Sequence, residues 1–300
     1  MGSNTTGQPT RSKSHTLCLH HNDPDGRASA MIVRRALGPQ IRLFEINYGD
    51  IVPWDLLESA QRVVIVDFSL PHDDMLRLAQ ERELTWIDHH ITAIQDMADI
   101  SGAWPGRRST SEAACVLAWQ YYFADHPLPQ GVVLIGDKDI WRMAEAETRP
   151  FNEGLLQENT HTDNLTLWEA ILDGDRGLIQ RLTSKGQVLL QARLNNLHRA
   201  ARRFGYPVNF EGYHTLVINR PGEGELIEIA TQQLGYEVAY CYVDSFQNGK
   251  LMTSVMIGSR SVDVSQIARK FGGGGHPGAS GFQFERGALP FPPGATVEIS

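Results

Sequence analysis

Short apolar runs alternate with helical patterns through the N-terminal half of this chain, and this alternation constrains the fold most strongly. The runs are rich in β-branched or aromatic side chains, which is typical of β-strands. They cover residues 16–20, 41–47, 63–68 and 84–87, and helical patterns cover residues 28–37 and 73–82. Strands that alternate with helices in this way form a parallel sheet. We therefore predict an α/β fold with a parallel sheet and helices on both of its faces.

The length of the chain indicates a further domain, because 300 residues with 41% hydrophobic side chains are long for a single core. We expect a disordered leader at residues 1–14, a first domain at 15–177, a connector helix at 178–207 and a smaller α/β domain at 208–300. In the smaller domain, strands are expected at residues 215–219, 238–244 and 251–257, and helices at 225–234 and 264–271. An Asn-Gly pair at Asn248 predicts a hairpin turn between the last two strands.

Composition excludes several classes of protein. The longest apolar runs last about four residues, whereas a membrane span needs about 20. Cys18, Cys115 and Cys241 match no paired motif and are expected to be buried thiols. The net charge of -8 argues against coating long nucleic acid. We expect a cytoplasmic protein that binds neither membranes nor long nucleic acid, and the oligomeric state is open, a homodimer included.

Acidic and histidine side chains gather where the predicted strands end. They are His21, Asp23 and Asp25 after the first strand, Asp67 in the third, Asp88, His89 and His90 after the fourth, and Asp137 and Asp139 after residues 131–136. The apolar residues 131–136 are interpreted as another strand or a short helix. Because ligands of such sheets bind at the carboxyl ends of the strands, we expect these side chains to share one edge.

Each group alone also has a structural explanation. The Asp23-Pro24-Asp25 turn suits an Asx turn and helix cap, Asp67 suits the end of a strand, and Lys138 can pair with its acidic neighbours in a surface turn. Two adjacent histidines are harder to explain as packing, since a strand end buries at most one of them. Imidazole mixed with carboxylate favours Mn, Fe, Co or Zn over Ca. One bimetal site explains all four groups together.

These residues resemble the motifs of the DHH phosphoesterase family, which is named for a tripeptide like Asp88-His89-His90. Residues 21–26 resemble the first family motif, Asp67 the second and Asp137 the fourth. The glycine-rich residues 272–282 are similar to the signature of the family's C-terminal associated domain. Many relatives place the first-motif histidine four residues before the first metal-binding aspartate, where this chain has Leu19. Here His21 lies two residues before Asp23, which resembles the short-oligonucleotide branch.

The resemblance implies two divalent metal ions, usually manganese, and a set of residues that hold them and the substrate. The implied ligands are Asp23, Asp25, Asp67, His89 and Asp137, with His21 as a further candidate. The choices between His21 and His20, and between Asp137 and Asp139, stay open at this point. Asp67 is expected to bridge the ions and His90 to lie near the substrate phosphate. Asp88 is expected to accept a hydrogen bond from a ligating imidazole. Substrate contacts are expected from Arg260, Gly273, Gly274, Gly275 and His276.

The expected activity is that of a manganese-dependent phosphodiesterase or 3'-5' exonuclease acting on very short oligoribonucleotides or dinucleotides. Alternatives within the family are hydrolysis of a cyclic dinucleotide or its linear product, of adenosine 3',5'-bisphosphate, or of short polyphosphate. A non-catalytic nucleotide sensor is the alternative from another class. Aromatic side chains that stack on bases would favour nucleotides over polyphosphate, but their positions do not follow from the sequence.

Overall fold

The computed structural model describes residues 16–299, and the chain divides into two compact units, residues 1–190 and 191–300. The leader predicted at residues 1–14 lies outside the described residues. Helix α9 (Arg176–Phe204) runs across the division between the units. Its first turns contribute Leu178 and Leu182 to the core of the first unit, and its last turns contribute Leu197 and Ala201 to the core of the second. The helix ends at Phe204, directly before Gly205.

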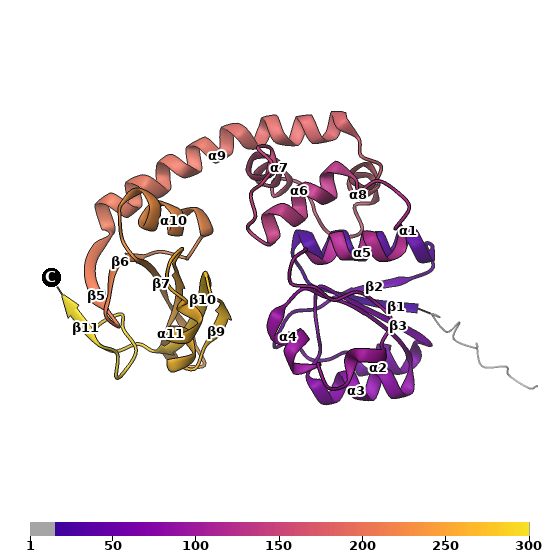
Figure 1. Cartoon of the computed structure of the whole chain (residues 1–300), viewed down its shortest axis with the longest axis horizontal. Helices are drawn as coiled ribbons and strands as arrows, with labels where there is room; N and C mark the ends of the chain where they lie inside the picture. Colours follow the sequence, from indigo (N-terminus) through magenta and orange to yellow (C-terminus); the bar gives the residue numbers. More distant parts are fainter. Residues whose placement is uncertain (1–15, 300) are drawn as a thin grey trace, which may run out of the picture. The chain divides into compact units, whose positions relative to one another are not determined.

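A four-stranded parallel sheet in the order β2-β1-β3-β4 forms the centre of the first unit (Figure 1). Its strands are β1 (Thr16–His20), β2 (Arg42–Glu45), β3 (Arg62–Val66) and β4 (Glu83–Ile87). Successive side chains face opposite sides of the sheet, so Leu17 and Leu19 enter one core and Cys18 the other. Strand β3 is buried on both faces, as its run of β-branched residues predicts.

Helices cover both faces of this sheet, which confirms the predicted fold class. The face of Leu17 packs against α2 (Trp54–Ser59), α3 (His72–Glu81) and α4 (Ile91–Asp96), and η1 (Ser101–Ala103) follows α4. The face of Cys18 packs against α1 (Pro24–Leu37), α5 (Ala114–Tyr122), α6 (Gln130–Asp139), α7 (Thr148–Leu155), α8 (Leu165–Leu172) and the start of α9. The three cysteines are buried free thiols, as expected.

Residues 131–136 lie in helix α6, the second of the two alternatives that the sequence offered, and the fourth acidic group forms the last turn of this helix. Two glycines let this helix pack closely against its neighbours. A Cβ atom on Gly131 would lie 2.8 Å from a methyl group of Ile171, and one on Gly136 would lie 2.8 Å from a methyl group of Val116. The apolar run therefore packs α6 against its neighbouring helices. In the sequence, such a run looks the same whether it is buried in a helix or in a sheet.

The second unit contains a seven-stranded sheet in the order β11-β5-β6-β7-β8-β10-β9, in which only the β6–β7 pair is parallel among the described strands. Its strands are β5 (Tyr206–Phe210), β6 (Tyr213–Asn219), β7 (Val238–Gln247), β8 (Lys250–Gly258), β9 (Gly274–His276), β10 (Ala279–Glu285) and β11 (Val297–Ile299). Its helices are α10 (Gly224–Glu228), the π-helical η2 (Ile229–Gln233) and α11 (Val264–Lys270).

The turn between β7 and β8 confirms the predicted hairpin, because Asn248 and Gly249 both have positive φ angles, of 50° and 79°. Strand β5 was not predicted, since Pro207 suggested only the end of a helix. The glycine-rich residues 272–282 contain the short strand β9, which pairs with the following strand β10. Among the described residues, no helix is long and apolar enough to span a membrane.

Replacing Ile65 with alanine should lower the free energy of unfolding by about 2–5 kcal/mol, because this side chain is fully buried in β3 and leaves a cavity. Val188 in α9 is 71% exposed, so Val188→Ala should stay within about 0.5 kcal/mol of the parent. Urea unfolding followed by circular dichroism measures both variants. Equal midpoints for the two variants would contradict the central place of β3 in the core.

Candidate metal centre

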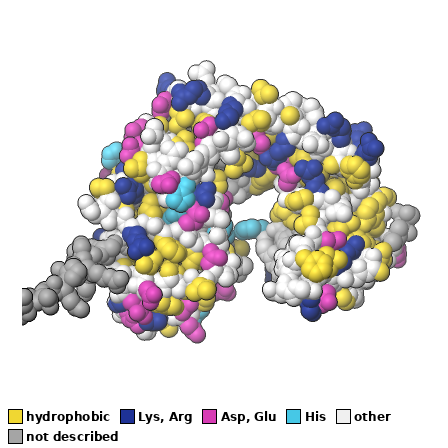
Figure 2. Space-filling view, turned by 180° about the vertical axis from the view of Figure 1, so that it is seen from behind, with side chains coloured by type: hydrophobic (Ala, Val, Ile, Leu, Met, Phe, Trp, Pro, Cys, Tyr) yellow, Lys and Arg dark blue, Asp and Glu magenta, His cyan; other side chains and the backbone are white. Residues whose placement is uncertain are grey.

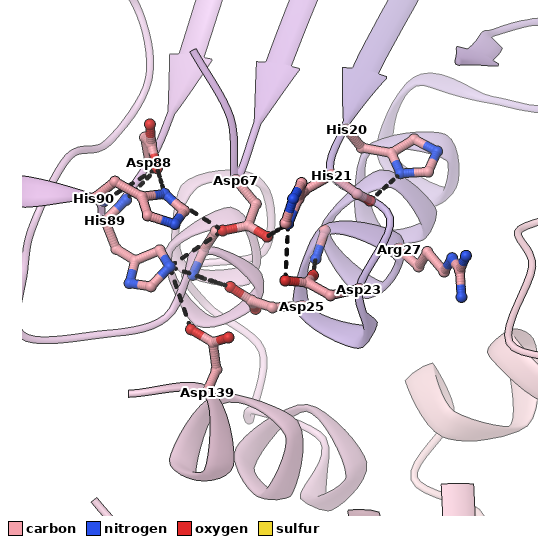
Figure 3. A network of polar contacts seen from close by, with 12 residues as sticks. His20, His21, Asp23, Asp25, Arg27, Asp67, Asp88, His89, His90 and Asp139 are labelled. Carbon is pink, nitrogen blue, oxygen red and sulfur yellow. Dashed lines mark hydrogen bonds and ion pairs between the residues drawn. The ribbon is translucent and has the colours of Figure 1, made fainter. Parts of the chain in front are cut away.

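The order of the strands creates a crevice at the carboxyl ends of β1 and β3. Strand β1 has β2 on one side and β3 on the other, so the connections on either side of β1 diverge there. Ligands of open α/β sheets bind at such a switch point. Asp23 and Asp25 follow β1, Asp67 follows β3, and the tripeptide beginning at Asp88 follows β4, so all three segments meet at this crevice (Figure 3).

The turn after β1 holds its side chains through a helix cap. Asp23 is the N-cap of α1, and its Oδ1 accepts a hydrogen bond of 2.8 Å from the amide of Gly26. A Cβ atom on Gly26 would lie 2.5 Å from the carbonyl oxygen of His21, so the turn closes only with glycine. The second oxygen, Oδ2, lies 2.9 Å from His21 Nδ1. Asp23 therefore caps the helix and joins the cluster at the same time.

Of the two adjacent histidines at the end of β1, only His21 joins the cluster. His21 Nδ1 lies 4.0 Å from Asp67 Oδ2. His20 is buried, its Nδ1 lies 2.8 Å from the carbonyl oxygen of His21, and burial lowers its pKa. In Figure 3 the ring of His20 lies on the far side of His21 from Asp67.

Asp25 is held by the first turn of another helix. Its two carboxylate oxygens accept hydrogen bonds from the amides of Ala114 and Cys115, both of 2.8 Å, at the N-terminus of α5. A helix N-terminus favours a negative charge. Burial nevertheless raises the pKa of Asp25, and the charge of Asp23 raises it further. Its Oδ2 lies 3.8 Å from His89 Nε2.

Asp67 lies at the middle of the cluster without the hydrogen bonds that a buried carboxylate usually has. Both of its oxygens are buried, and among the described residues neither accepts a hydrogen bond. Burial raises its pKa well above the usual value, and the charges of Asp25, Asp23 and Asp139 raise it further. The backbone is also strained, with φ at 55° for a residue other than glycine. A cation would satisfy both of these buried oxygens.

The tripeptide turns two histidines toward Asp67 while Asp88 holds their backbone. Asp88 Oδ1 accepts hydrogen bonds from the amides of His89 and His90 and lies 2.8 Å from His90 Nδ1. His89 Nε2 lies 3.1 Å from Asp67 Oδ1 and 3.2 Å from Asp139 Oδ2. Asp88 therefore orients the ring of His90, and His89 lies between the carboxylates.

Of the two aspartates at the end of α6, the structure brings Asp139, and not Asp137, to the cluster. The carboxylate of Asp137 accepts hydrogen bonds from the amides of Ala144 and Glu145 and from the hydroxyl of Thr148. Burial would raise the pKa of Asp137, but these hydrogen bonds outweigh burial and lower it. Side chains two residues apart on a helix point about 200° from each other, so only one of the two aspartates can face the crevice.

Three overlapping groups of donor atoms in this centre can each hold a metal ion. They are Asp67, His89 and His90; His21, Asp23 and Asp67; and Asp25, His89 and Asp139. Within each group the donor atoms lie within 4.8 Å of one another. Asp67 belongs to two groups and offers two oxygens. The residues therefore fit a divalent transition-metal ion by donor type, charge and proximity.

The substrate residues predicted in the second unit have other partners in the structure. Arg260 Nη2 lies 2.5 Å from Glu228 Oε1. Gly274, Gly275 and His276 form β9, and the amide of Gly273 donates to the carbonyl of Ala268. These glycines therefore lie at the edge of the sheet, and the amide of Gly273 is already bonded within the protein. Contact of these residues with a substrate stays a prediction.

Sequence reasoning missed Tyr48, whose ring lies 6.1 Å from that of His21 and 6.2 Å from that of His90. Nothing in the local pattern marked it, because it lies in a loop outside the apolar periodicity. The sequence placed Asp137 in the ligand set but left the choice between Asp137 and Asp139 open, because residues 131–136 could be a strand or a short helix.

Asp67→Asn and Asp139→Asn should each reduce the stabilisation by Mn²⁺, because each change removes a charged donor from the centre. The parent should gain about 2.7 kcal/mol at a Mn²⁺ concentration of 100 times Kd. Asparagine tolerates the positive φ at position 67, so the variant should fold. Thermal unfolding with Mn²⁺ and with a chelator measures the difference, and an undiminished response in both variants would contradict the metal assignment.

Asp137→Asn should lower stability by about 1–3 kcal/mol, since a charged acceptor of three hydrogen bonds is lost. Its response to Mn²⁺ should match that of the parent, because Asp137 does not face the centre. The same thermal unfolding experiment measures both quantities. Loss of the metal response in Asp137→Asn, with retention in Asp139→Asn, would restore the original prediction.

Comparison with known proteins bears on the fold. No protein-family model matches the chain. An uncharacterized protein of Acanthamoeba polyphaga mimivirus is 24% identical over 242 residues, which cover 77% of this chain but only 55% of the viral protein. The structure of a pGpG-specific phosphodiesterase from Vibrio cholerae has a TM-score of 0.49 at 13% identity, covering 90% of this chain and 93% of that one.

The DHH domain of a member of a family of ribosomal proteins is also similar in structure. Its TM-score is 0.58 at 13% identity, over 89% of this chain and 82% of that one. The parallel sheet flanked by helices and the second unit with its own sheet both fall within this overlap. The chain therefore has the fold of a DHH-domain protein.

Proposed function

We propose that this chain is a metal-dependent phosphoesterase that hydrolyses phosphodiester bonds of very short oligoribonucleotides or dinucleotides. The observation that carries the proposal is Asp67, a buried carboxylate whose oxygens accept no hydrogen bond from the described residues, with three other carboxylates and three imidazoles around it. The DHH-domain fold and the motif-like segments around Asp23, Asp67 and His89 support the same assignment.

Two divalent ions, most simply manganese, suit the overlap of the donor groups. Asp67 offers one oxygen toward His21 and the other toward His89, as expected of a bridging carboxylate. Asp23 and His21 would complete one side, and Asp25, His89 and Asp139 the other. When bound, such ions lower the pKa of a water molecule and neutralise charge on phosphoryl oxygens.

His90 is the most exposed of the three histidines of the centre and is the one we expect to meet the substrate. Its side chain is 26% exposed, whereas that of Asp67 is 1% exposed. Asp88 Oδ1 lies 2.8 Å from its Nδ1, so Nε2 is the ring atom that can donate to a phosphate oxygen. Asp88 holds the ring in this orientation and is a positioning residue.

The distribution of charge supports a short substrate. The net charge of the chain is -8, and acidic and basic side chains lie interspersed on the face of the first unit that Figure 2 shows. A protein that binds long nucleic acid by releasing counterions uses many Lys and Arg contacts along one surface. A substrate with one or two phosphates needs only the local charge of the metal centre.

The test is product analysis in Mn²⁺ with RNAs of two to 20 nucleotides, cyclic and linear dinucleotides, adenosine 3',5'-bisphosphate and short polyphosphate. The parent should cleave the shortest RNAs fastest, and a chelator should stop the reaction. Asp139→Asn should lose more than about 100-fold in rate. Asp137→Asn is the matched control and should retain most of the activity at a temperature where it is folded.

Other outcomes would replace the proposal. Cleavage of polyphosphate but of no nucleotide would assign a polyphosphatase, and preference for the bisphosphate would assign a phosphatase. Tight binding of nucleotides without cleavage of any substrate would favour a nucleotide sensor. Activity that persists in the chelator and in Asp139→Asn would place the chemistry outside this centre.

A further inference from the structure

An exposed aromatic ring, that of Tyr48, lies at the rim of the metal centre. The loop that carries it connects β2 to α2, and the amide of Ile46 donates to the carbonyl of His20 at the end of β1. The ring of Tyr48 lies about 6 Å from two histidines of the centre, at 6.1 Å from His21 and 6.2 Å from His90. Tyr48 is 55% exposed.

The ring of Tyr48 is held in place by a contact with Phe68 and by hydrogen bonds within its own loop. Its centroid lies 4.6 Å from that of Phe68, which is buried and directly follows Asp67. The loop is closed by two hydrogen bonds, from the amide of Asn47 to Asp50 Oδ2 and from the amide of Asp50 to the carbonyl of Asn47. The ring is therefore a supported platform beside the centre.

A single exposed aromatic ring is common on protein surfaces, so the position of Tyr48 beside two histidines of the charged centre carries the argument, and not its exposure alone. Burial on the anchored side and the charge of Asp88 raise the pKa of Tyr48 to about 12, so the hydroxyl keeps its proton near neutral pH. Ile51 in the same loop is 94% exposed, so the loop presents two apolar side chains. The charged centre thus has an apolar border on the side of this loop.

We infer that Tyr48 stacks on a nucleobase whose adjacent phosphate lies in the metal centre, which makes nucleotides the substrate class and disfavours polyphosphate. This inference rests on the proposed function and adds the part of the substrate that a phosphate-binding centre does not recognise. Stacking on an aromatic ring accepts every base, because each has a π-face. Polyphosphate has no apolar part and would gain nothing from the ring.

Tyr48 is thus a binding residue for the base and not part of the bond-breaking machinery. If it were only structural, its removal would weaken all substrates alike through a disturbed centre. A base-stacking role instead predicts an effect that depends on the presence of the base. Comparing the effect of the substitution on substrates with and without bases separates the two roles, whereas the loss of activity on one substrate does not.

The experiment measures kcat and KM for a diribonucleotide and for the same phosphodiester with abasic sugars, in Mn²⁺. The parent should prefer the complete dinucleotide by about 10-fold or more in kcat/KM. Tyr48→Ala should lose most of this preference through a higher KM, with kcat little changed. Tyr48→Phe should retain it, because the ring remains.

Tyr121→Ala is the matched control. Tyr121 is a partly exposed tyrosine of the same unit, 40% exposed, whose ring packs on Tyr122 in α5 and not on the centre. This variant should keep the preference for the complete dinucleotide. The stabilisation of every variant by Mn²⁺ should equal that of the parent, which shows that the centre is intact.

Failure of this inference and failure of the proposed function give different results. If the parent cleaves both substrates equally well, or if Tyr48→Ala keeps the preference, base stacking at Tyr48 is wrong while the phosphoesterase assignment stands. If the parent cleaves neither, the proposed function fails, and calorimetric titration with a non-hydrolysable dinucleotide and its abasic analogue then decides. Tighter binding of the analogue with bases, lost in Tyr48→Ala, would support the stacking role; equal binding would overturn it.

Discussion

The candidate site depends on the buried carboxylate of Asp67 at the end of the central strand β3. Its two oxygens accept no hydrogen bond among the described residues, its φ is positive, and its pKa is raised by burial and then by the charges of four further aspartates. Electrostatic repulsion of this kind opposes folding unless positive charge is bound. The surrounding elements hold the carboxylates in spite of this repulsion. A strand fixes Asp67, a helix cap fixes Asp23, and the N-terminus of α5 fixes Asp25.

Capping and metal binding are combined in the same side chains. Asp23 caps α1 with one oxygen and faces His21 with the other. Asp88 bonds two backbone amides and also orients His90. The structural and functional explanations of these aspartates, which appear as alternatives in the sequence, are therefore both valid. A carboxylate has two oxygens and about four lone-pair sites, which is enough for both roles.

Much of the first unit could be predicted from sequence because its strands are short, apolar and followed by polar turns. The predictions failed where one pattern fits two structures. Residues 131–136 are apolar on all sides, so periodicity could not separate a buried strand from helix α6, and the choice between Asp137 and Asp139 depended on that assignment. Strand β5 was missed because Pro207 suggests a break, although it is tolerated in the sheet beside Leu216. Tyr48 could not be singled out because its neighbours in space, His21, Phe68 and His90, follow other strands of the sheet.

The hydrogen bonds to Asp25 come from the main chain of Ala114 and Cys115. No substitution of those two residues, apart from proline, removes the donors, so this contact is insensitive to the side chains that provide it. It is sensitive to the position of the whole helix α5, which packs through Leu117 and Trp119 into the core. Substitutions in that core that shift α5 would therefore also shift Asp25. Residues far from the centre would then be under selection because they fix the position of the N-terminus of α5.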